Sequence, residues 1–272
     1  MVILPTGCGK THVMGLAPFF LNATAVIIIT PDKTINYQVT HHLSDLYKYG
    51  SSVAKTIGSP LPTVSTYEAG KNTVVTNVVV ANIQALVEGG NGADAENTGT
   101  TIKEAFAQFL IDRKFDLCII DEGHHCPAKS WEAVERRLLG VNPACRTILL
   151  TATPLRSDGV RFNLHSGTDY YYLCKRADAV RDGYIKSTQP HPIEVDFQAP
   201  ATKYCNESYL AVMLDAAVQK LKDLRASCNN IPVRMLVSAR TNKSARTISE
   251  FFNRRYNSDN LKAVDISGDN SE

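Results

Sequence analysis

The feature that most constrains the fold of this chain is a glycine-rich stretch at its start, residues 4–11, LPTGCGKT. Glycine adopts backbone conformations that other residues avoid, so Gly7 and Gly9 allow the chain to curl with several N–H groups pointing to one place. Such a curl joins a strand to a helix, whose N-terminus favours phosphate. Because Lys10 can reach the β/γ-phosphates and Thr11 can ligate Mg²⁺, the stretch predicts binding of a nucleoside triphosphate.

The stretch meets the known pattern for such loops only in part. The strict form G-x-x-x-x-G-K-[ST] requires a glycine where this chain has Leu4, whereas the looser form T-G-x-G-K-T is complete. A glycine-rich turn that opens a helix and carries lysine and threonine by coincidence is the alternative, so a second motif is needed. The residues expected to cradle the nucleotide are Pro5, Thr6, Gly7, Cys8, Gly9, Lys10 and Thr11.

An apolar run that ends in two carboxylates supplies the second motif. Residues 115–120 precede Asp121 and Glu122, and such a run predicts a strand of a parallel sheet, buried on both faces. Ligands of these sheets bind at the carboxyl ends of the strands. Asp121 is therefore placed to hold Mg²⁺ beside Thr11, and Glu122 to orient and deprotonate the attacking water. A solvated strand end is the alternative, but the phosphate loop upstream argues against it.

The residues that follow give a family by resemblance. Residues 121–125, DEGHH, resemble the D-E-x-H box of superfamily-two helicases and translocases, and residues 149–154, LLTATP, resemble their third motif. Residues 30–33 with Gln38, and residues 81–86, look like two further motifs of the same family. With LTATPLRSDG at residues 150–159, the chain resembles most closely the type III restriction-subunit-like helicases, over about residues 2–272.

The resemblance implies an ATP- and Mg²⁺-dependent helicase or translocase core. In it, Lys10 and Thr11 bind phosphate and Mg²⁺, Asp121 holds the metal, and Glu122 is the catalytic base. His124, Thr151 and Thr153 would link the nucleotide site to lobe closure and to the nucleic-acid track. The residues that would contact nucleic acid, DNA rather than RNA, are Pro31, Lys33, Gln84 and Arg240. Nuclease or methylation partner subunits fit the same family.

Strand and helix patterns alternate along the chain, which predicts an α/β fold. Strands are expected at residues 2–4, 25–30, 74–81, 115–120 and 146–151, and helices at residues 10–21, 33–48, 102–112 and 129–139. By resemblance this is a P-loop NTPase fold, a RecA-like doubly wound parallel sheet, followed by a truncated second RecA-like lobe. The expected domains are residues 1–187 for the first lobe, 188–201 for a connector and 202–272 for the partial second lobe.

The second half of the chain carries weaker patterns. Helices are expected at residues 207–225 and 244–256 and a strand at residues 233–238. The tyrosines at positions 170–172 suit a half-buried strand better than a base-stacking surface, because consecutive strand residues alternate faces. Members of the family continue for about half a lobe that holds an arginine finger, so the chain looks like a fragment. It should then bind ATP and hydrolyse it slowly.

Composition sets limits on the class of protein. A net charge of +2 does not by itself indicate nucleic-acid binding, which therefore rests on the family. The apolar region at residues 16–29 is too short and too polar to span a bilayer. Seven cysteines without paired spacing favour reduced thiols and an intracellular location, cytoplasmic or nuclear. No zinc site is expected. Cys8 is a candidate reactive thiol at a helix N-terminus, although in similar proteins this position faces away from the nucleotide.

Two alternatives of other classes stay open. The chain could be a nucleic-acid-binding module that binds nucleotide with little turnover. It could also be a P-loop ATPase that acts on something other than nucleic acid. A nucleic-acid-stimulated ATPase measurement separates these two from the helicase reading.

Overall fold

The protein is described by a computed structural model at residues 1–48, 51–57, 61–68, 76–88, 101–125, 129–153, 170–188, 207–228, 233–239, 241–257 and 261–264. The chain divides into two compact units, Met1–Ser187 and Thr188–Glu272. Among the described residues, no helix combines the length and the apolar character needed to cross a membrane.

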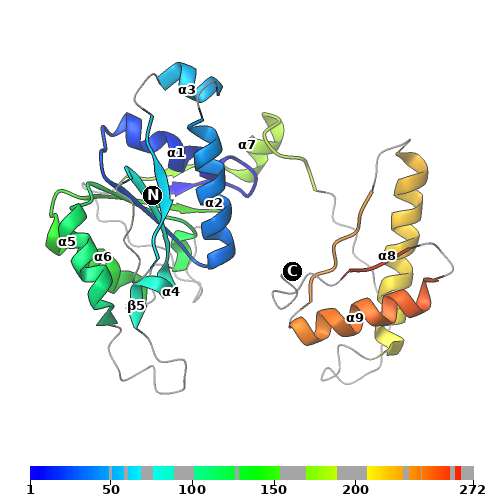
Figure 1. Ribbon diagram of the computed structural model, residues 1–272. Coiled ribbons are helices and arrows are strands. Elements are labelled where there is room, and N and C mark those ends of the chain that lie inside the picture. Colours follow the sequence, from blue (N-terminus) through cyan, green and yellow to red (C-terminus); the bar gives the residue numbers. More distant parts are fainter. Residues whose placement is uncertain are drawn as a thin grey trace. The chain divides into compact units, whose positions relative to one another are not determined.

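A parallel sheet organises the first unit (Figure 1). Within the described residues it has seven strands in the order β3-β4-β2-β7-β8-β1-β9, and every pairing between them is parallel. The carboxyl ends of all these strands therefore meet at one edge. The strands are β1 (Val2–Ile3), β2 (Val26–Thr30), β3 (Val64–Thr66), β4 (Val78–Asn82), β7 (Leu117–Ile120), β8 (Arg146–Thr151) and β9 (Tyr172–Leu173). A separate antiparallel pair joins β5 (Val87–Glu88) to β6 (Thr101–Ile102).

Helices connect the strands and cover both faces of the sheet (Figure 1). Those of the first unit are α1 (Lys10–Phe20), α2 (Lys33–Leu46), α3 (Ser52–Ile57), α4 (Ile83–Leu86), α5 (Glu104–Arg113), the 3-10 turn η1 (Gly123–His125), α6 (Lys129–Val141) and α7 (Arg176–Arg181). Helices α1 and α2 pack on one face, and α5 and α6 on the other. The RecA-like doubly wound α/β fold expected from the sequence is thus confirmed.

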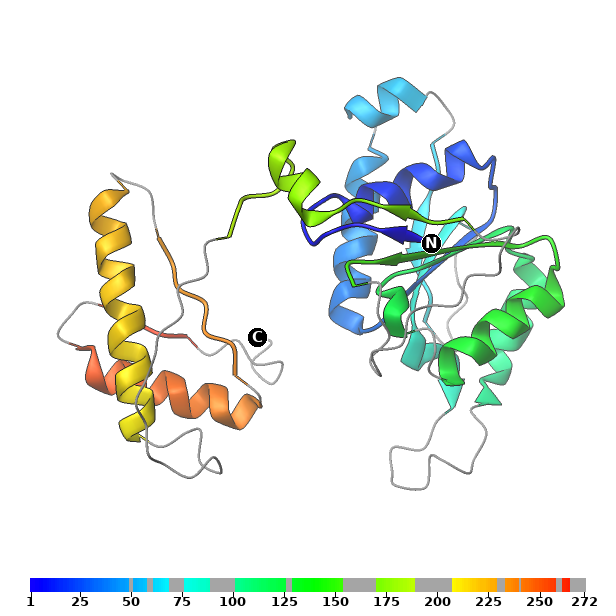
Figure 2. The ribbon, with the colours of Figure 1, turned by 180° about the vertical axis from the view of Figure 1, so that it is seen from behind.

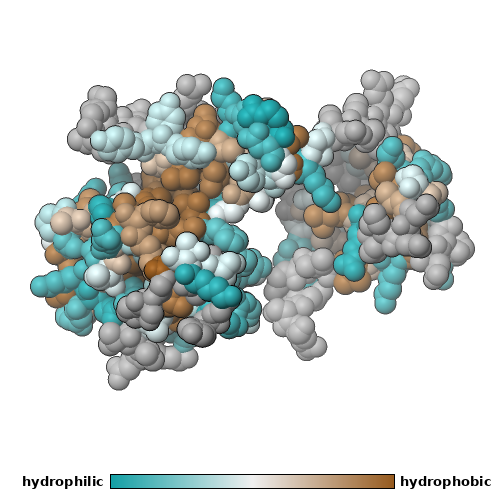
Figure 3. Space-filling model, turned by 90° about the horizontal axis from the view of Figure 1, so that it is seen from above, coloured by the Kyte–Doolittle hydropathy of each residue, from teal (hydrophilic) through white to brown (hydrophobic). Residues whose placement is uncertain are grey.

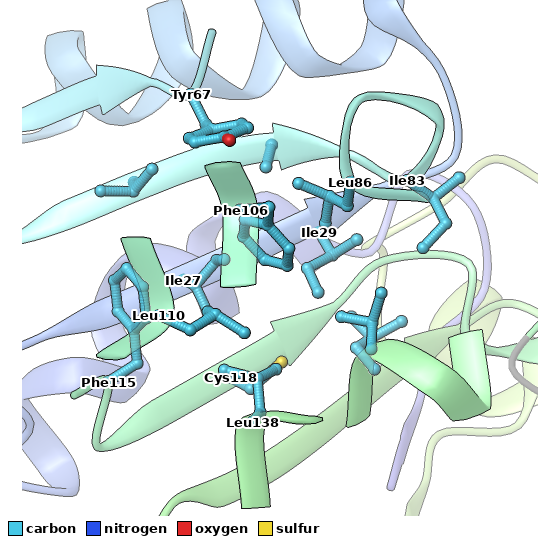
Figure 4. Packing of buried hydrophobic residues seen from close by; sticks show 14 of the residues in the cluster. Ile27, Ile29, Tyr67, Ile83, Leu86, Phe106, Leu110, Phe115, Cys118 and Leu138 are labelled. Carbon is cyan, nitrogen blue, oxygen red and sulfur yellow. The ribbon is translucent and has the colours of Figure 1, made fainter. Parts of the chain in front are cut away.

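The strands at the centre of the sheet are buried on both faces because alternate residues enter two different cores. In β2, Ile27 and Ile29 pack with Phe106 of α5, while Val26 and Ile28 pack with α1 and α2. Figure 4 shows the first of these cores, in which the Phe106 ring of α5 lies beside Ile29 of β2. This two-sided burial explains why the strands read as continuous apolar runs in the sequence.

Large apolar side chains also reach the surface of the first unit. Figure 3 shows hydrophobic residues gathered on the face of this unit that is seen from above. The tyrosines at positions 170–172 are among the exposed residues, from 84% exposed at Tyr170 to 60% at Tyr172. The expectation of a half-buried strand there is wrong, because only Tyr172 joins β9 and this strand lies at the edge of the sheet.

The second unit contains two long helices, α8 (Glu207–Ser227) and α9 (Asn242–Arg255). They pack through a small core that includes Leu214, Val218 and Phe252. Both helices were expected, but the strand expected at residues 233–238 does not form, since the described residues 233–239 have no strand partner. The expected connector, residues 188–201, lies outside the described residues apart from Thr188.

The close approach of α1 to α2 gives a stability prediction. A Cβ on Gly15 would lie 2.3 Å from Leu46 Cδ2 and 3.0 Å from Leu43 Cδ2, and both leucines are buried. Gly15→Ala should therefore destabilise the first unit by about 1–3 kcal/mol. Gly140→Ala is the matched control, because nothing lies within 4 Å of a Cβ at this exposed position of α6. It should stabilise by roughly 0.5–1 kcal/mol, and thermal unfolding of both variants tests the pair.

Candidate functional site

Three neighbouring strands bring the candidate catalytic residues to one place. Strand β1 pairs with β8, and β8 pairs with β7, so the segments that follow these strands are adjacent at the carboxyl edge of the sheet. The Leu4 N–H donates to the Thr151 carbonyl at 2.9 Å, which extends the pairing to the start of the glycine-rich loop. The loop, the Asp121-Glu122 pair and the Thr151–Thr153 segment therefore border one site.

The glycine-rich loop has the conformation that its glycines allow. Gly7 and Gly9 have φ angles of 88° and 85°, in the left-handed region where a side chain causes strain. The Cys8 N–H donates to the Pro5 carbonyl at 3.1 Å and closes the turn. Gly9 is the N-cap of α1 and provides no side-chain cap, so first-turn N–H groups stay available to an anion. A phosphate fits this end of α1, which carries no acidic residue in its first turn.

An ion pair joins the loop to the strand end. Lys10 Nζ donates to Glu122 Oε1 at 2.8 Å, and the two side chains are only 14% and 27% exposed. Glu122 itself has a φ of 50°, and a non-glycine residue in this region is held there by its surroundings. Its N–H donates to Asp121 Oδ1 at 3.0 Å. Glu122 thus pairs with Lys10 while Asp121 accepts the Glu122 N–H, so the two adjacent carboxylates have different environments.

Asp121 is the more buried of the two carboxylates, with 6% of its surface exposed. Burial, and then the negative charge of Glu122, raises its pKa, while Lys10 and the Glu122 N–H act in the opposite direction. A buried carboxylate beside a second carboxylate needs positive charge, and carboxylate oxygens are the ligands that Mg²⁺ prefers. The donor set therefore fits a divalent cation held by Asp121. Thr11 lies in the first turn of α1, directly after Lys10.

A chain of polar contacts runs from Glu122 to the third motif. His124 Nδ1 lies 3.3 Å from Glu122 Oε2 and 3.0 Å from Thr151 Oγ1. The buried Thr151 hydroxyl donates to the Thr153 carbonyl at 2.9 Å and accepts the Thr153 N–H at 3.1 Å. Because that hydroxyl proton is engaged with Thr153, the proton between His124 and Thr151 belongs to Nδ1. The imidazole thus connects the ends of β7 and β8.

The glycine of the DEGHH motif has a packing role in this arrangement. A Cβ on Gly123 would lie 3.0 Å from Leu149 Cβ, tighter than nearly all such contacts. The short turn η1 therefore lies against β8 only because residue 123 has no side chain. This close approach places the His124 ring beside Thr151.

A separate groove of about 620 Å³ lies over the ends of β2, β3 and β4. Gln84 Nε2 donates to the Pro31 carbonyl at 2.6 Å, which brings together two of the residues expected to contact nucleic acid. Lys33 also lines the groove. Arg240, the fourth of these residues, lies outside the described residues, as does Pro154 of the third motif.

Among the groove residues that sequence reasoning missed are an exposed tyrosine and a second lysine. Tyr37 is 71% exposed and lines the groove one turn along α2 from Lys33. Lys103 Nζ donates to the Gln84 carbonyl at 3.1 Å and also lines it. The spacing of four residues between Lys33 and Tyr37 is a signal that could have found the tyrosine. Lys103 has no such signal, because its position depends on the pairing of β5 with β6.

Comparison with known proteins gives the family. The family model described as "Type III restriction enzyme, res subunit" matches residues 1–156, which is more than half of the 272 residues. No curated protein matches the chain.

Solved structures of two helicases are similar to the chain. The UvsW helicase from bacteriophage T4 is 15% identical with a TM-score of 0.35, over 57% of this chain and 46% of that one. The Pyrococcus furiosus Hef helicase domain is 19% identical with a TM-score of 0.43, over 96% of this chain and 50% of that one. The chain thus spans about half the length of these two structures. On the family match, the chain belongs to the type III restriction enzyme res subunit family.

Proposed function

We propose that the first unit binds ATP with Mg²⁺ and hydrolyses it to drive movement on, or remodelling of, a nucleic acid. The observation that carries this proposal is the Lys10–Glu122 ion pair, which couples the lysine of the phosphate loop to the candidate catalytic base. Membership of the type III restriction enzyme res subunit family supports the same reaction.

Each residue of the site has a role that its environment supports. The loop amides between Gly7 and Lys10 would hold the phosphates, and Lys10 would bind their β/γ oxygens. Asp121 and Thr11 would hold Mg²⁺, which when bound neutralises charge that develops on the transferred phosphoryl group. Glu122 would accept a proton from the attacking water.

The ion pair implies an exchange of partners when the triphosphate binds. In this structure Lys10 Nζ donates to Glu122 Oε1 at 2.8 Å. Triphosphate oxygens carry more negative charge than one carboxylate, so they compete for the ammonium group. Glu122 then keeps His124, 3.3 Å away, as a neighbour and becomes available to water. The base is therefore released only when a phosphate occupies the loop, which would limit futile reactions.

His124, Thr151 and Thr153 would report that exchange to the rest of the protein. The Glu122 carboxylate shares the His124 ring with the Thr151 hydroxyl, and this hydroxyl orders the backbone of Thr153. A shift of Glu122 would thus reach the segment after β8 through direct hydrogen bonds. We assign these three residues the coupling of the nucleotide site to lobe closure.

The groove over β2, β3 and β4 is the candidate nucleic-acid contact, because it combines cations with polar and aromatic side chains. Lys33 and Lys103 supply two charges for phosphates, Gln84 supplies an amide, and Tyr37 supplies a ring for stacking. DNA is the expected nucleic acid.

Removing the two groove lysines should weaken nucleic-acid binding and leave ATP binding intact. The double variant Lys33→Ala with Lys103→Ala loses two phosphate contacts, so the magnitude of the slope of log affinity against log salt on single-stranded DNA should fall by about 1.4. Titration of fluorescent single-stranded DNA at several salt concentrations measures this slope. Lys48→Ala with Lys55→Ala is the charge-matched control, since both lysines are exposed and outside the groove. An unchanged slope in the groove variant would exclude this surface.

An ATPase measurement tests the proposal as a whole. Phosphate release is followed with ATP and Mg²⁺ alone, with single-stranded DNA and with single-stranded RNA. Stimulation by a nucleic acid is the expected result. Binding of ATP without stimulated turnover would favour a nucleotide-binding module, and turnover that neither nucleic acid changes would favour an ATPase with another substrate. Absence of ATP binding would contradict the proposal.

A further inference from the structure

The candidate site has a catalytic end and an opposite end, where the nucleoside of a bound triphosphate would lie. Glu122 follows β7, and its ion pair with Lys10 at 2.8 Å marks the catalytic end, where the γ-phosphate is expected. In the sheet, β1 lies between β8 and β9, and β7 lies beyond β8. A triphosphate that spans the loop with its γ-phosphate at Glu122 therefore directs its nucleoside away from β7, toward the β9 side of the loop.

The segment that follows β9 borders this side of the loop. Figure 2 shows β9 beside β1 at the edge of the sheet, with α7 next along the chain. The Cys174 N–H donates to the Ile3 carbonyl at 3.0 Å, so the chain leaves β9 at the edge where the loop leaves β1. After α7 the chain returns to the loop, because Ile185 Cγ2 lies 3.4 Å from the position that a Cβ on Gly7 would occupy. The end of α7 and the phosphate loop are thus neighbours in space although they are far apart in the sequence.

A helix-terminating turn fixes the backbone at this contact. Gly183 has a φ of 78°, and its N–H donates to the Val180 carbonyl at 3.1 Å. The Tyr184 N–H donates to the Ala179 carbonyl at 2.9 Å, which completes the pair of bonds typical of a Schellman motif. Ala179 is fully buried, so the turn is anchored in the first unit. Residues 183–185 are therefore positioned by hydrogen bonds before a ligand binds.

The side chains at this turn suit a nucleobase. Tyr184 is 71% exposed, so much of its ring is open to a planar ligand. Ile185 is half-buried beside the loop and adds an apolar surface. Aromatic rings stack on bases of every kind, because each base has a π-face. The turn thus offers a stacking surface on the side of the loop that the nucleoside faces.

Charge at the end of α7 does not favour a phosphate. Arg181 donates to Asp178 Oδ1 at 3.0 Å and to Asp182 Oδ1 at 2.8 Å, so this cation is already engaged by two carboxylates. Phosphate is favoured instead at the glycine-rich loop, where the N-terminus of α1 has no acidic residue in its first turn. The turn therefore fits the base of a nucleotide, and the loop fits its phosphates.

We propose that Tyr184 and Ile185 form a subsite for the base of the bound nucleoside triphosphate, in which the base stacks on the Tyr184 ring. The ligand class is a purine nucleoside triphosphate, because two fused rings offer the larger stacking surface. The subsite rests on the proposed nucleotide site, since the loop and Glu122 set the direction in which the ligand lies.

Comparison of two ligands separates binding of the base from binding of the phosphates. Titration calorimetry measures the affinity for a non-hydrolysable ATP analogue and for inorganic tripolyphosphate, each with Mg²⁺. Tyr184→Ala should weaken binding of the ATP analogue about tenfold, which converts to about 1.4 kcal/mol, and leave tripolyphosphate binding unchanged. Tyr184→Phe keeps the ring and should bind both ligands as the wild type does.

Tyr170→Ala is the matched control. Tyr170 is 84% exposed but lies at the amino end of the sheet, where its carbonyl accepts from the Met1 amino group at 2.6 Å. This variant should change neither affinity. Unchanged affinity of Tyr184→Ala for the ATP analogue, or an equal loss for both ligands, would overturn the subsite. A wild-type protein that binds neither ligand would contradict the nucleotide site itself, and the subsite with it.

Photochemical labelling tests the position of the base directly. An ATP derivative that carries a photoreactive azide on its base should attach to the peptide that contains Tyr184. Excess tripolyphosphate should prevent this labelling, because it competes for the loop. His12 and His42 are the other aromatic pair near the loop, with ring centroids 5.4 Å apart on α1 and α2. Label found only at these histidines would place the base on the other side of the loop and overturn the subsite.

Discussion

Glu122→Gln should lower the rate of ATP hydrolysis by about 10² to 10⁴, the range that a general base contributes. Glutamine keeps the shape of the side chain, and its carbonyl oxygen can still accept from Lys10, but it cannot accept a proton. ATP affinity should be retained or improved, because an amide holds the Lys10 ammonium less tightly than the carboxylate does at 2.8 Å. The change in rate should therefore appear in the chemical step and not in binding.

Single-turnover hydrolysis at saturating ATP and Mg²⁺ measures that step, and ATP-induced thermal stabilisation measures binding separately. Glu132→Gln is the matched control, since this glutamate is exposed on α6 and belongs to the same strand-turn-helix segment. It should leave both quantities unchanged. Normal hydrolysis by Glu122→Gln would place the base at another residue.

Much of the fold of the first unit could be predicted because short stretches of its sequence determine its strands and motifs. Strand β7 is a short apolar run followed at once by Asp121 and Glu122, and two-sided burial makes such runs visible. Parallel pairing then brings the ends of strands to one edge, whatever their order in the sequence. The phosphate loop and the DEGHH motif could thus be placed near each other from the sequence before any contact was known.

Features that depend on distant pairing could not be predicted. Strand β9 has two exposed residues, Tyr172 and Leu173. It exists only because β1 offers it an edge 170 residues earlier in the chain, where Val2 lies opposite Tyr172. The short strand β3 likewise depends on β4.

The strand that we expected at residues 233–238 also depends on pairing with a distant segment, and here the strand does not form. The pattern of the segment suits a strand, yet β-propensity expresses packing on a sheet surface and not a preference of the isolated backbone. Within the described part of the chain no strand pairs with residues 233–239, and Leu236 is 87% exposed. Helices α8 and α9 form because their hydrogen bonds are internal and their apolar faces pack together.

Lys10→Ala should abolish most of the ATP-induced stabilisation. A ligand at 100 times its Kd stabilises the folded state by about 2.7 kcal/mol, and loss of the lysine removes the cation that binds the β/γ-phosphates. Without ligand the variant should unfold within a few degrees of the wild type, because Glu122 keeps its contact with His124. Thermal unfolding with and without ATP and Mg²⁺ measures both effects.

Lys48→Ala, at an exposed lysine paired with Asp45 at the end of α2, is the control and should retain full stabilisation. We expect Lys10 both to bind phosphate and to restrain Glu122. If ATP stabilised the Lys10→Ala variant as much as the wild type, Lys10 would not bind phosphate, and its ion pair with Glu122 would be a purely structural contact.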